Sequence, residues 1–158
     1  MGQAMEAGER RWRLLPLRVV IGYGFLAHGL AKWSRGPAGF AAMLQQLGVP
    51  LPHVTAWVVT LVEVTGGLAI LVGLCIPLAS VPLAASMLVA MFTVHIHFGF
   101  SAVNTIGLTR SGPVFGPPGY EINLLYIAGL AVLAFAGPSP WSVDRWRQRQ
   151  LASRRVDS

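Results

Sequence analysis

Residues that can exchange protons lie inside long apolar stretches of this sequence. His28 and Lys32 are one helical turn apart in the run Leu17 to Trp33, Glu63 stands near the middle of a second run, and His95 lies near the end of a third. Histidine and carboxylate side chains are the usual groups for proton transfer near neutral pH. Because an ionisable residue inside a membrane span costs roughly 2.5 to 3.5 kcal/mol on insertion scales, we expect these residues to have partners or a use.

The first apolar run has an interior face and a lipid face when it is drawn as a helix. The small, aromatic and basic residues fall on one stripe at helical spacing: Arg18, Gly22, Phe25, Gly29 and Lys32, with His28 beside them. The opposite side has no group that needs water and is expected to face lipid: Val19, Val20, Leu26, Leu30 and Ala31. Arg18 and Lys32 lie near the two ends of the run. They either reach the two membrane interfaces or take a place inside the protein.

Depth along the apolar runs sorts the polar residues into two layers, if each run is a helix with a rise of about 1.5 Å per residue. The outer layer holds four ionisable residues that we expect to face one another: His28, Lys32, His95 and Glu121. In this layer Glu121 would neutralise Lys32 or a protonated histidine. Beneath it we expect Glu63, Tyr23 and Tyr126, with Met91 a little farther out.

Three interpretations of these layers stay open. One is a buried network of ion pairs and hydrogen bonds that sets how the helices pack. Another is a quinone pocket, in which four residues would handle protons (Glu63, His28, His95 and Glu121) and four would bind the headgroup (Tyr23, Lys32, Tyr126 and Met91). Haem or copper is disfavoured, because methionine on an apolar helix usually serves packing and no c-type haem attachment motif is present. We therefore expect no metal site.

Composition places the chain in a membrane. Hydrophobic residues make up 54% of the sequence and charged residues 11%, whereas a soluble domain has about 25% charged residues. Eight of the twelve Lys and Arg residues lie in the two terminal segments, so the net charge of +6 indicates cytoplasmic termini and not a nucleic-acid partner. Cytoplasmic termini at both ends require an even number of spans. Cys75 is the single cysteine, which excludes an intramolecular disulfide.

Four apolar segments are long enough to cross a bilayer: residues 14–33, 53–74, 78–98 and 120–136. They predict an all-α integral membrane four-helix bundle, as a single domain over residues 1–158 with cytoplasmic tails at 1–13 and 141–158. Between the first two spans, the apolar spacing in FAAMLQQLGV predicts a short amphipathic helix. The connection 98–119 is rich in glycine and proline, and its length favours a functional loop or one that folds back onto the bundle.

Four sequence features together resemble the DoxX family of small bacterial membrane proteins, whose members include DoxD-like proteins. They are the stripe of the first helix from Arg18 to Lys32, EVTGGLAILVGL from Glu63 to Leu74, YEINLL from Tyr120, and GPSPWSVD from Gly137 to Asp144. One departure follows the Gly-Leu turn. The family usually has a basic residue there, and this chain has Cys75, Ile76 and Pro77.

The resemblance implies a multi-pass four-helix protein of the bacterial cytoplasmic (inner) membrane. It also implies a subunit of a quinone-linked redox complex, in sulfur oxidation or in the handling of thiols and oxidative stress with a soluble redox enzyme. The leading expectation is therefore a quinone-interacting subunit of such an oxidoreductase. A non-catalytic membrane anchor or scaffold that recruits a soluble enzyme, and a pathway for small solutes or protons, remain alternatives. Association of the chain with itself stays open.

Overall fold

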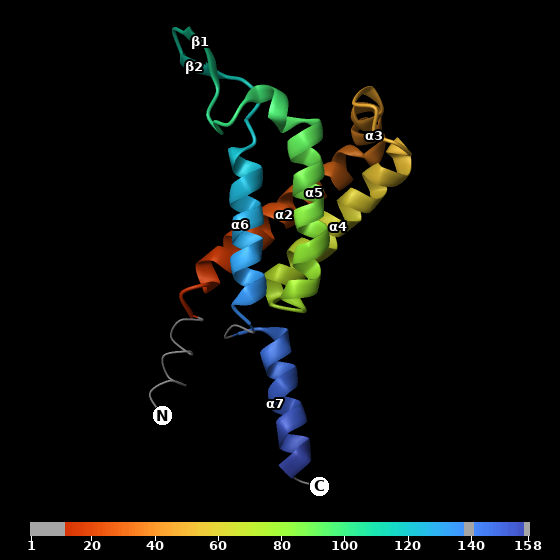
Figure 1. Cartoon of the computed structure of the whole chain (residues 1–158), viewed down its shortest axis with the longest axis vertical. Coiled ribbons are helices and arrows are strands. Elements are labelled where there is room, and N and C mark those ends of the chain that lie inside the picture. Colours follow the sequence, from red (N-terminus) through yellow and green to blue (C-terminus); the bar gives the residue numbers. More distant parts are fainter. Residues whose placement is uncertain (1–11, 138–140, 157–158) are drawn as a thin grey trace.

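The structure is a computed structural model that describes residues 12–137 and 141–156, and it is mostly helical (Figure 1). Its α-helices are α2 (Leu15–Arg35), α3 (Pro37–Gln46), α4 (Pro52–Val72), α5 (Ile76–Thr93), α6 (Glu121–Phe135) and α7 (Val143–Val156). A short 3-10 helix, η1 (His95–Phe98), and an antiparallel pair of strands, β1 (Thr105–Thr109) and β2 (Gly112–Phe115), lie between α5 and α6.

The helices α2, α4, α5 and α6 pack in a closed order: α2 contacts α4, α4 contacts α5, α5 contacts α6, and α6 contacts α2. Figure 1 shows α5 and α6 side by side, with α2 and α4 crossing them at an angle. The start of α2, the turn between α4 and α5, and the end of α6 lie at the lower end of the view, where α7 points away from the other helices. The outer ends carry α3 on one side and the β1–β2 hairpin on the other.

Glycines bring the backbones of α2 and α4 into direct contact. A Cβ atom on Gly67 would lie 2.6 Å from the backbone nitrogen of Leu26, and one on Gly22 would lie 2.8 Å from that of Leu71. Small residues permit such close approach and are typical of helix contacts in membranes. The stripe expected on the first helix is confirmed in part: Arg18, Gly22, Phe25 and Gly29 are buried. Lys32 is half-buried, and His28 is exposed.

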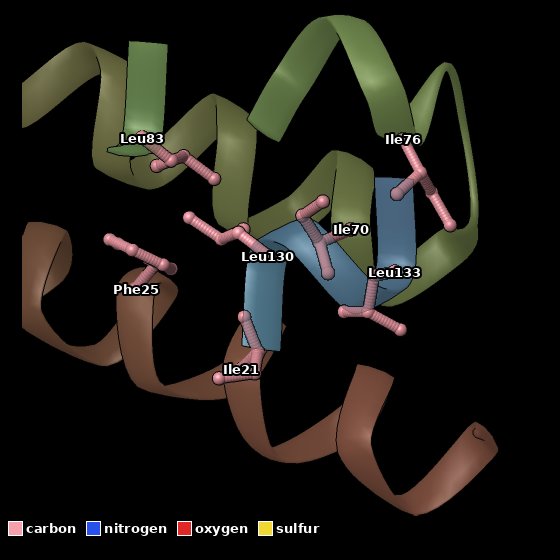
Figure 2. Packing of buried hydrophobic residues seen from close by; sticks show 7 residues of the cluster. All are labelled: Ile21, Phe25, Ile70, Ile76, Leu83, Leu130 and Leu133. Atoms are coloured by element: carbon pink, nitrogen blue, oxygen red, sulfur yellow. The ribbon is translucent and has the colours of Figure 1, made fainter. Parts of the chain in front are cut away.

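The main apolar core lies between the four long helices (Figure 2). Its side chains come from α2 (Ile21 and Phe25), α4 (Ile70), α5 (Ile76 and Leu83) and α6 (Leu130 and Leu133). Large apolar side chains also cover the outside. Phe135 is 92% exposed and Leu78 is 74% exposed. An apolar exterior of this kind needs an apolar partner, and lipid is the partner that fits a membrane helix.

By length and composition, two helices of the described ranges could cross a membrane, α4 and α5, and α6 is a shorter apolar helix of 15 residues. The structure confirms that the chain is mainly α-helical, as the sequence predicts. It also confirms the short helix predicted between the first two spans, which is α3.

The prediction of an all-α chain was wrong for the connection 98–119. Thr105 to Phe115 forms a hairpin with a bulge next to Ile106 and a turn at Arg110 and Ser111, because threonine and branched side chains on both sides of the turn favour strands. The third helix was also predicted too long. It ends at Thr93, and His95 lies in η1. Most of the C-terminal tail is helical, as α7, whereas residues 1–11 of the N-terminal tail and Pro138 to Pro140 of the GPSPWSVD segment lie outside the described residues.

Placing a methyl group at the contact of α2 and α4 should destabilise the protein. We expect Gly67→Ala to lower the free energy of unfolding by about 1 to 3 kcal/mol, because its Cβ meets backbone atoms that cannot move independently. Gly39→Ala in α3 is the matched control, since a Cβ there meets nothing within 4 Å. Thermal unfolding in mild detergent measures both. Equal unfolding temperatures for the two variants would contradict the contact.

Candidate functional site

The central polar feature is an ion pair between α2 and α4. The Lys32 ammonium nitrogen lies 2.5 Å from both carboxylate oxygens of Glu63 and donates a hydrogen bond to each. The Glu63 side chain is 3% exposed and that of Lys32 is 26% exposed. A buried carboxylate is therefore joined to a cation that still reaches the surface. Burial of this kind in an apolar setting strengthens the attraction between the two charges.

A glycine makes room for this pair. A Cβ on Gly29 would lie 3.0 Å from the Cβ of Glu63 and 2.8 Å from the backbone nitrogen of Val64. Gly29 stands three residues before Lys32, so the same close contact that excludes side chains at Gly29 brings the Lys32 ammonium over Glu63. The segment EVTGG supplies both parts on α4, since Glu63 and Gly67 are one turn apart.

An aromatic ring covers the lysine. Its ammonium nitrogen lies 5.0 Å from the centroid of the Phe40 ring, which α3 supplies. Such cation–π contacts contribute from about 0.5 kcal/mol at exposed sites to about 2 kcal/mol where water is excluded. Trp33, the next residue on α2, packs edge to face on Trp57 of α4, with ring centroids 5.7 Å apart. Phe40 was not among the residues expected at the site, and its place in the short amphipathic helix was the only sequence signal for it.

Several of the expected site residues lie apart from the ion pair. His28 and Tyr23 are exposed on the outside of α2, and Tyr23 is 64% exposed. The ring of Tyr126 packs edge to face on Phe25 at 5.1 Å, and Met91 is buried in α5. The expected inner layer of Glu63 with Tyr23 and Tyr126 does not form, because Tyr23 points outward and Glu63 pairs with Lys32.

The outer layer expected from depth alone was also wrong in its pairing. Glu121 accepts a hydrogen bond from the backbone N–H of Ala102, at 2.8 Å, and Nδ1 of His95 contacts the carbonyl oxygen of Pro118 at 2.9 Å. Both residues thus hold the connection 98–119 onto the ends of α5 and α6. Depth does not specify which way a helix is rotated, and α2 diverges from α5 and α6 at this end (Figure 1).

Asn123 is a buried polar residue that the sequence interpretation did not select. It is 3% exposed, and its side-chain nitrogen donates to the carbonyl oxygen of Met87 at 3.3 Å. Within the described part of the chain its Oδ1 has no hydrogen-bond partner. Such a residue holds α6 to α5, and an asparagine in an apolar helix was the signal that could have indicated it.

A second polar cluster joins the lower ends of the helices and explains Arg18. This residue is 4% exposed, and its guanidinium donates to the carbonyl oxygen of Trp141 at 3.1 Å. The adjoining carboxylate of Asp144 accepts the backbone N–H of Cys75 at 2.7 Å, next to the start of α5. A Cβ on Gly73 would lie 2.5 Å from that of Ser142. Arg18 therefore lies inside the protein, at the junction of three connections.

Comparison with known proteins agrees with this arrangement of motifs. The family model described as DoxX matches residues 13–96, which is more than half of the chain and includes both members of the Lys32–Glu63 pair. The chain belongs to the DoxX family. The conclusion drawn from the four sequence features is thereby confirmed, and membership of this family makes the chain a membrane protein.

Three curated proteins from bacteria are similar in sequence to this DoxX protein. An uncharacterized membrane protein of Mycobacterium tuberculosis is 26% identical over 82% of this chain and 77% of its own length. A Bacillus subtilis protein with the printed name "Putative oxidoreductase CatD" is 32% identical over 63% of this chain and 69% of its own length. An uncharacterized protein of Haemophilus influenzae is 26% identical over 85% of this chain and 90% of its own length. No solved structure matches the chain.

The contribution of Lys32 to the stability of the protein should depend on the presence of Glu63, and the reverse. Lys32→Met leaves the Glu63 carboxylate buried without its cation, so we expect a loss of roughly 2 to 3 kcal/mol in the free energy of unfolding, below the range for fully buried pairs because Lys32 is partly exposed. The double variant Lys32→Met/Glu63→Gln should lose less than the sum of the two single variants. Thermal unfolding in detergent provides the comparison, and strictly additive losses would argue against the pair.

Proposed function

We propose that this DoxX protein is a quinone-interacting subunit of a redox complex in the bacterial cytoplasmic membrane, and that the Lys32–Glu63 pair handles its protons. The single observation that carries the proposal is a buried carboxylate whose cation partner reaches the surface of the helices. We therefore narrow the residues that handle protons to Glu63 and Lys32, with His28 exposed one turn earlier on α2.

In this proposal all four long helices cross the membrane as a bundle, with both termini in the cytoplasm. The apolar exteriors of α4, α5 and α6 support it, and so does the placement of arginines in α7. With 21 residues, α2 is about 31 Å long, enough to cross the hydrocarbon core although it carries charges. The inward position of Arg18 and the pairing of Lys32 remove the main energetic objection to this span.

The groups around Lys32 fit the headgroup of a quinone. Two N–H bonds of the ammonium are used by Glu63, and the third is available to a carbonyl oxygen at the exposed side. His28 is exposed one turn earlier on α2, where it can exchange a proton. Phe40 supplies a flat apolar surface next to the ammonium. Tyr126 and Met91 pack in the interior, so we leave them out of the binding surface.

A quinone supplies two-electron chemistry when bound, since its reduction takes up two electrons and two protons. The electrons would come from a soluble partner that oxidises a thiol or another reduced sulfur compound. The chain itself would supply protons: Lys32 can pass one to the headgroup and regain one from water at its exposed side, and the Glu63 carboxylate stabilises the ammonium that forms again. The oxidoreductase name of the Bacillus subtilis relative agrees with a redox role.

A membrane scaffold is the second candidate, and α7 favours it. This helix points away from the other helices and carries Arg145, Arg147 and Arg149, a surface suited to a soluble partner or to the membrane surface (Figure 1). A scaffold would use the Lys32–Glu63 pair only to hold α2 against α4.

Quinone binding distinguishes the two candidates. We expect quinone in an organic extract of the purified protein, and a drop of at least several-fold in Glu63→Gln. Glu121→Gln is the matched control. The glutamine amide oxygen can still accept the Ala102 N–H, and residue 121 contacts the connection 98–119 and not the Lys32–Glu63 pair. Binding of a short-chain quinone, followed by quenching of tryptophan fluorescence, provides a second readout, since Trp33 adjoins Lys32.

The proposal fails if the purified protein neither retains nor binds quinone, or if Glu63→Gln binds it as well as the unchanged chain does. Thermal unfolding of both variants has to accompany the assay, so that a loss of binding is separated from a loss of folded protein. If the protein neither retains nor binds quinone, the membrane scaffold becomes the function that the structure supports best.

A further inference from the structure

A cavity of about 420 Å³ lies at the lower end of the molecule, away from the Lys32–Glu63 pair. The turn before α5 and its first residues form one wall, through Cys75, Ile76 and Pro77. The end of α6 forms another, through Leu133 and Gly137. Its size is within the range of about 300 to 1,000 Å³ that is usual for small-molecule sites.

The third wall is one face of α7. Its lining residues are Asp144, Arg147, Gln148 and Leu151. They stand at i, i+3, i+4 and i+7, the spacing of a single helix face. The polar groups of the cavity thus come mainly from α7, whereas Ile76, Pro77 and Leu133 supply apolar surface.

Charge favours an anionic occupant. Arg147 carries the positive charge of the lining, and Asp144 the negative one. One oxygen of the Asp144 carboxylate already accepts the Cys75 N–H, so this acid is engaged in the fold of the turn. Arg145 and Arg149 lie outside the lining and add to the net positive charge of α7. A guanidinium in this setting is a good donor to phosphate oxygens.

The cavity also lies where lipid headgroups would be. It touches the first turn of α5 and the last turns of α6, which carry strongly exposed apolar residues such as Leu78 and Phe135. Trp141 and Trp146 are 78% and 61% exposed at the same end, and tryptophan prefers the membrane interface. Acyl chains could therefore follow the apolar exterior of α5 and α6 while the headgroup enters the cavity.

We propose that this cavity binds an anionic phospholipid of the cytoplasmic leaflet, with the lipid phosphate at Arg147 and the acyl chains along α5 and α6. Lipid bound here would brace α7 against the helices and hold the arginine-rich helix at the membrane surface. The inference rests on the membrane crossing of α5 and α6 in the proposed function. It does not need the quinone role, and the two proposals can fail separately.

Cys75 offers a direct test, because it lines the cavity, is exposed and is the single cysteine of the chain. The protein in mild detergent would be labelled with a maleimide in the presence of phosphatidylglycerol or of phosphatidylcholine. We expect phosphatidylglycerol to slow labelling at least several-fold relative to phosphatidylcholine. The protection should disappear in Arg147→Gln.

Arg149→Gln is the matched control, because it removes the same charge from α7 at a position outside the cavity lining. It should keep the protection seen in the unchanged chain. Equal labelling rates with the two lipids would overturn the proposal. So would equal loss of protection in Arg147→Gln and Arg149→Gln, since that result would indicate attraction to the whole basic helix and not a site.

Discussion

The direct backbone contact between α2 and α4 is the constraint on which the polar centre of this protein depends. Gly22, Gly29 and Gly67 leave no space for side chains between the two helices. The Lys32 ammonium can therefore reach the Glu63 carboxylate across a short gap, and Glu63 can be buried with its charge compensated. Without that contact the carboxylate would lie in an apolar interior with no cation, which is the most expensive arrangement available to it.

Different polar contacts hold the connecting segments at the two ends of the helices. At the lower end, Arg18, Asp144 and the Gly73 turn tie the first helix, the α4–α5 connection and the start of α7 together. At the outer end, His95 and Glu121 hold the long connection through backbone groups. Polar residues near the ends of apolar helices thus serve the connections, and one pair alone, Lys32 with Glu63, joins two of the long helices by opposite charges within the described ranges.

The family motifs acquire a physical meaning from these contacts. Glu63 and Gly67 belong to one motif because the carboxylate and the close approach are needed on the same face of α4. Gly29 and Lys32 have the corresponding positions on α2. The WSVD part of the last motif is explained by the junction, where Asp144 accepts the Cys75 N–H and the Ser142 hydroxyl accepts the N–H of Arg145 near the start of α7.

The sequence by itself determined the class of protein, the approximate helices and the interior face of α2, because hydrophobicity, charge placement and helical period are local properties of the chain. It also selected Glu63 and Lys32, since ionisable residues in apolar runs are costly wherever they stand. The tertiary structure decided the partners. Depth along a helix predicted Glu121 near Lys32, but rotation and tilt depend on how the glycines of α2 and α4 interlock, and these paired Lys32 with Glu63. The cavity under α7 was likewise beyond local pattern, because its lining comes from segments that meet only after the helices have packed. The hairpin at 105–115 is local, and its threonine and branched side chains were the signal that could have indicated it.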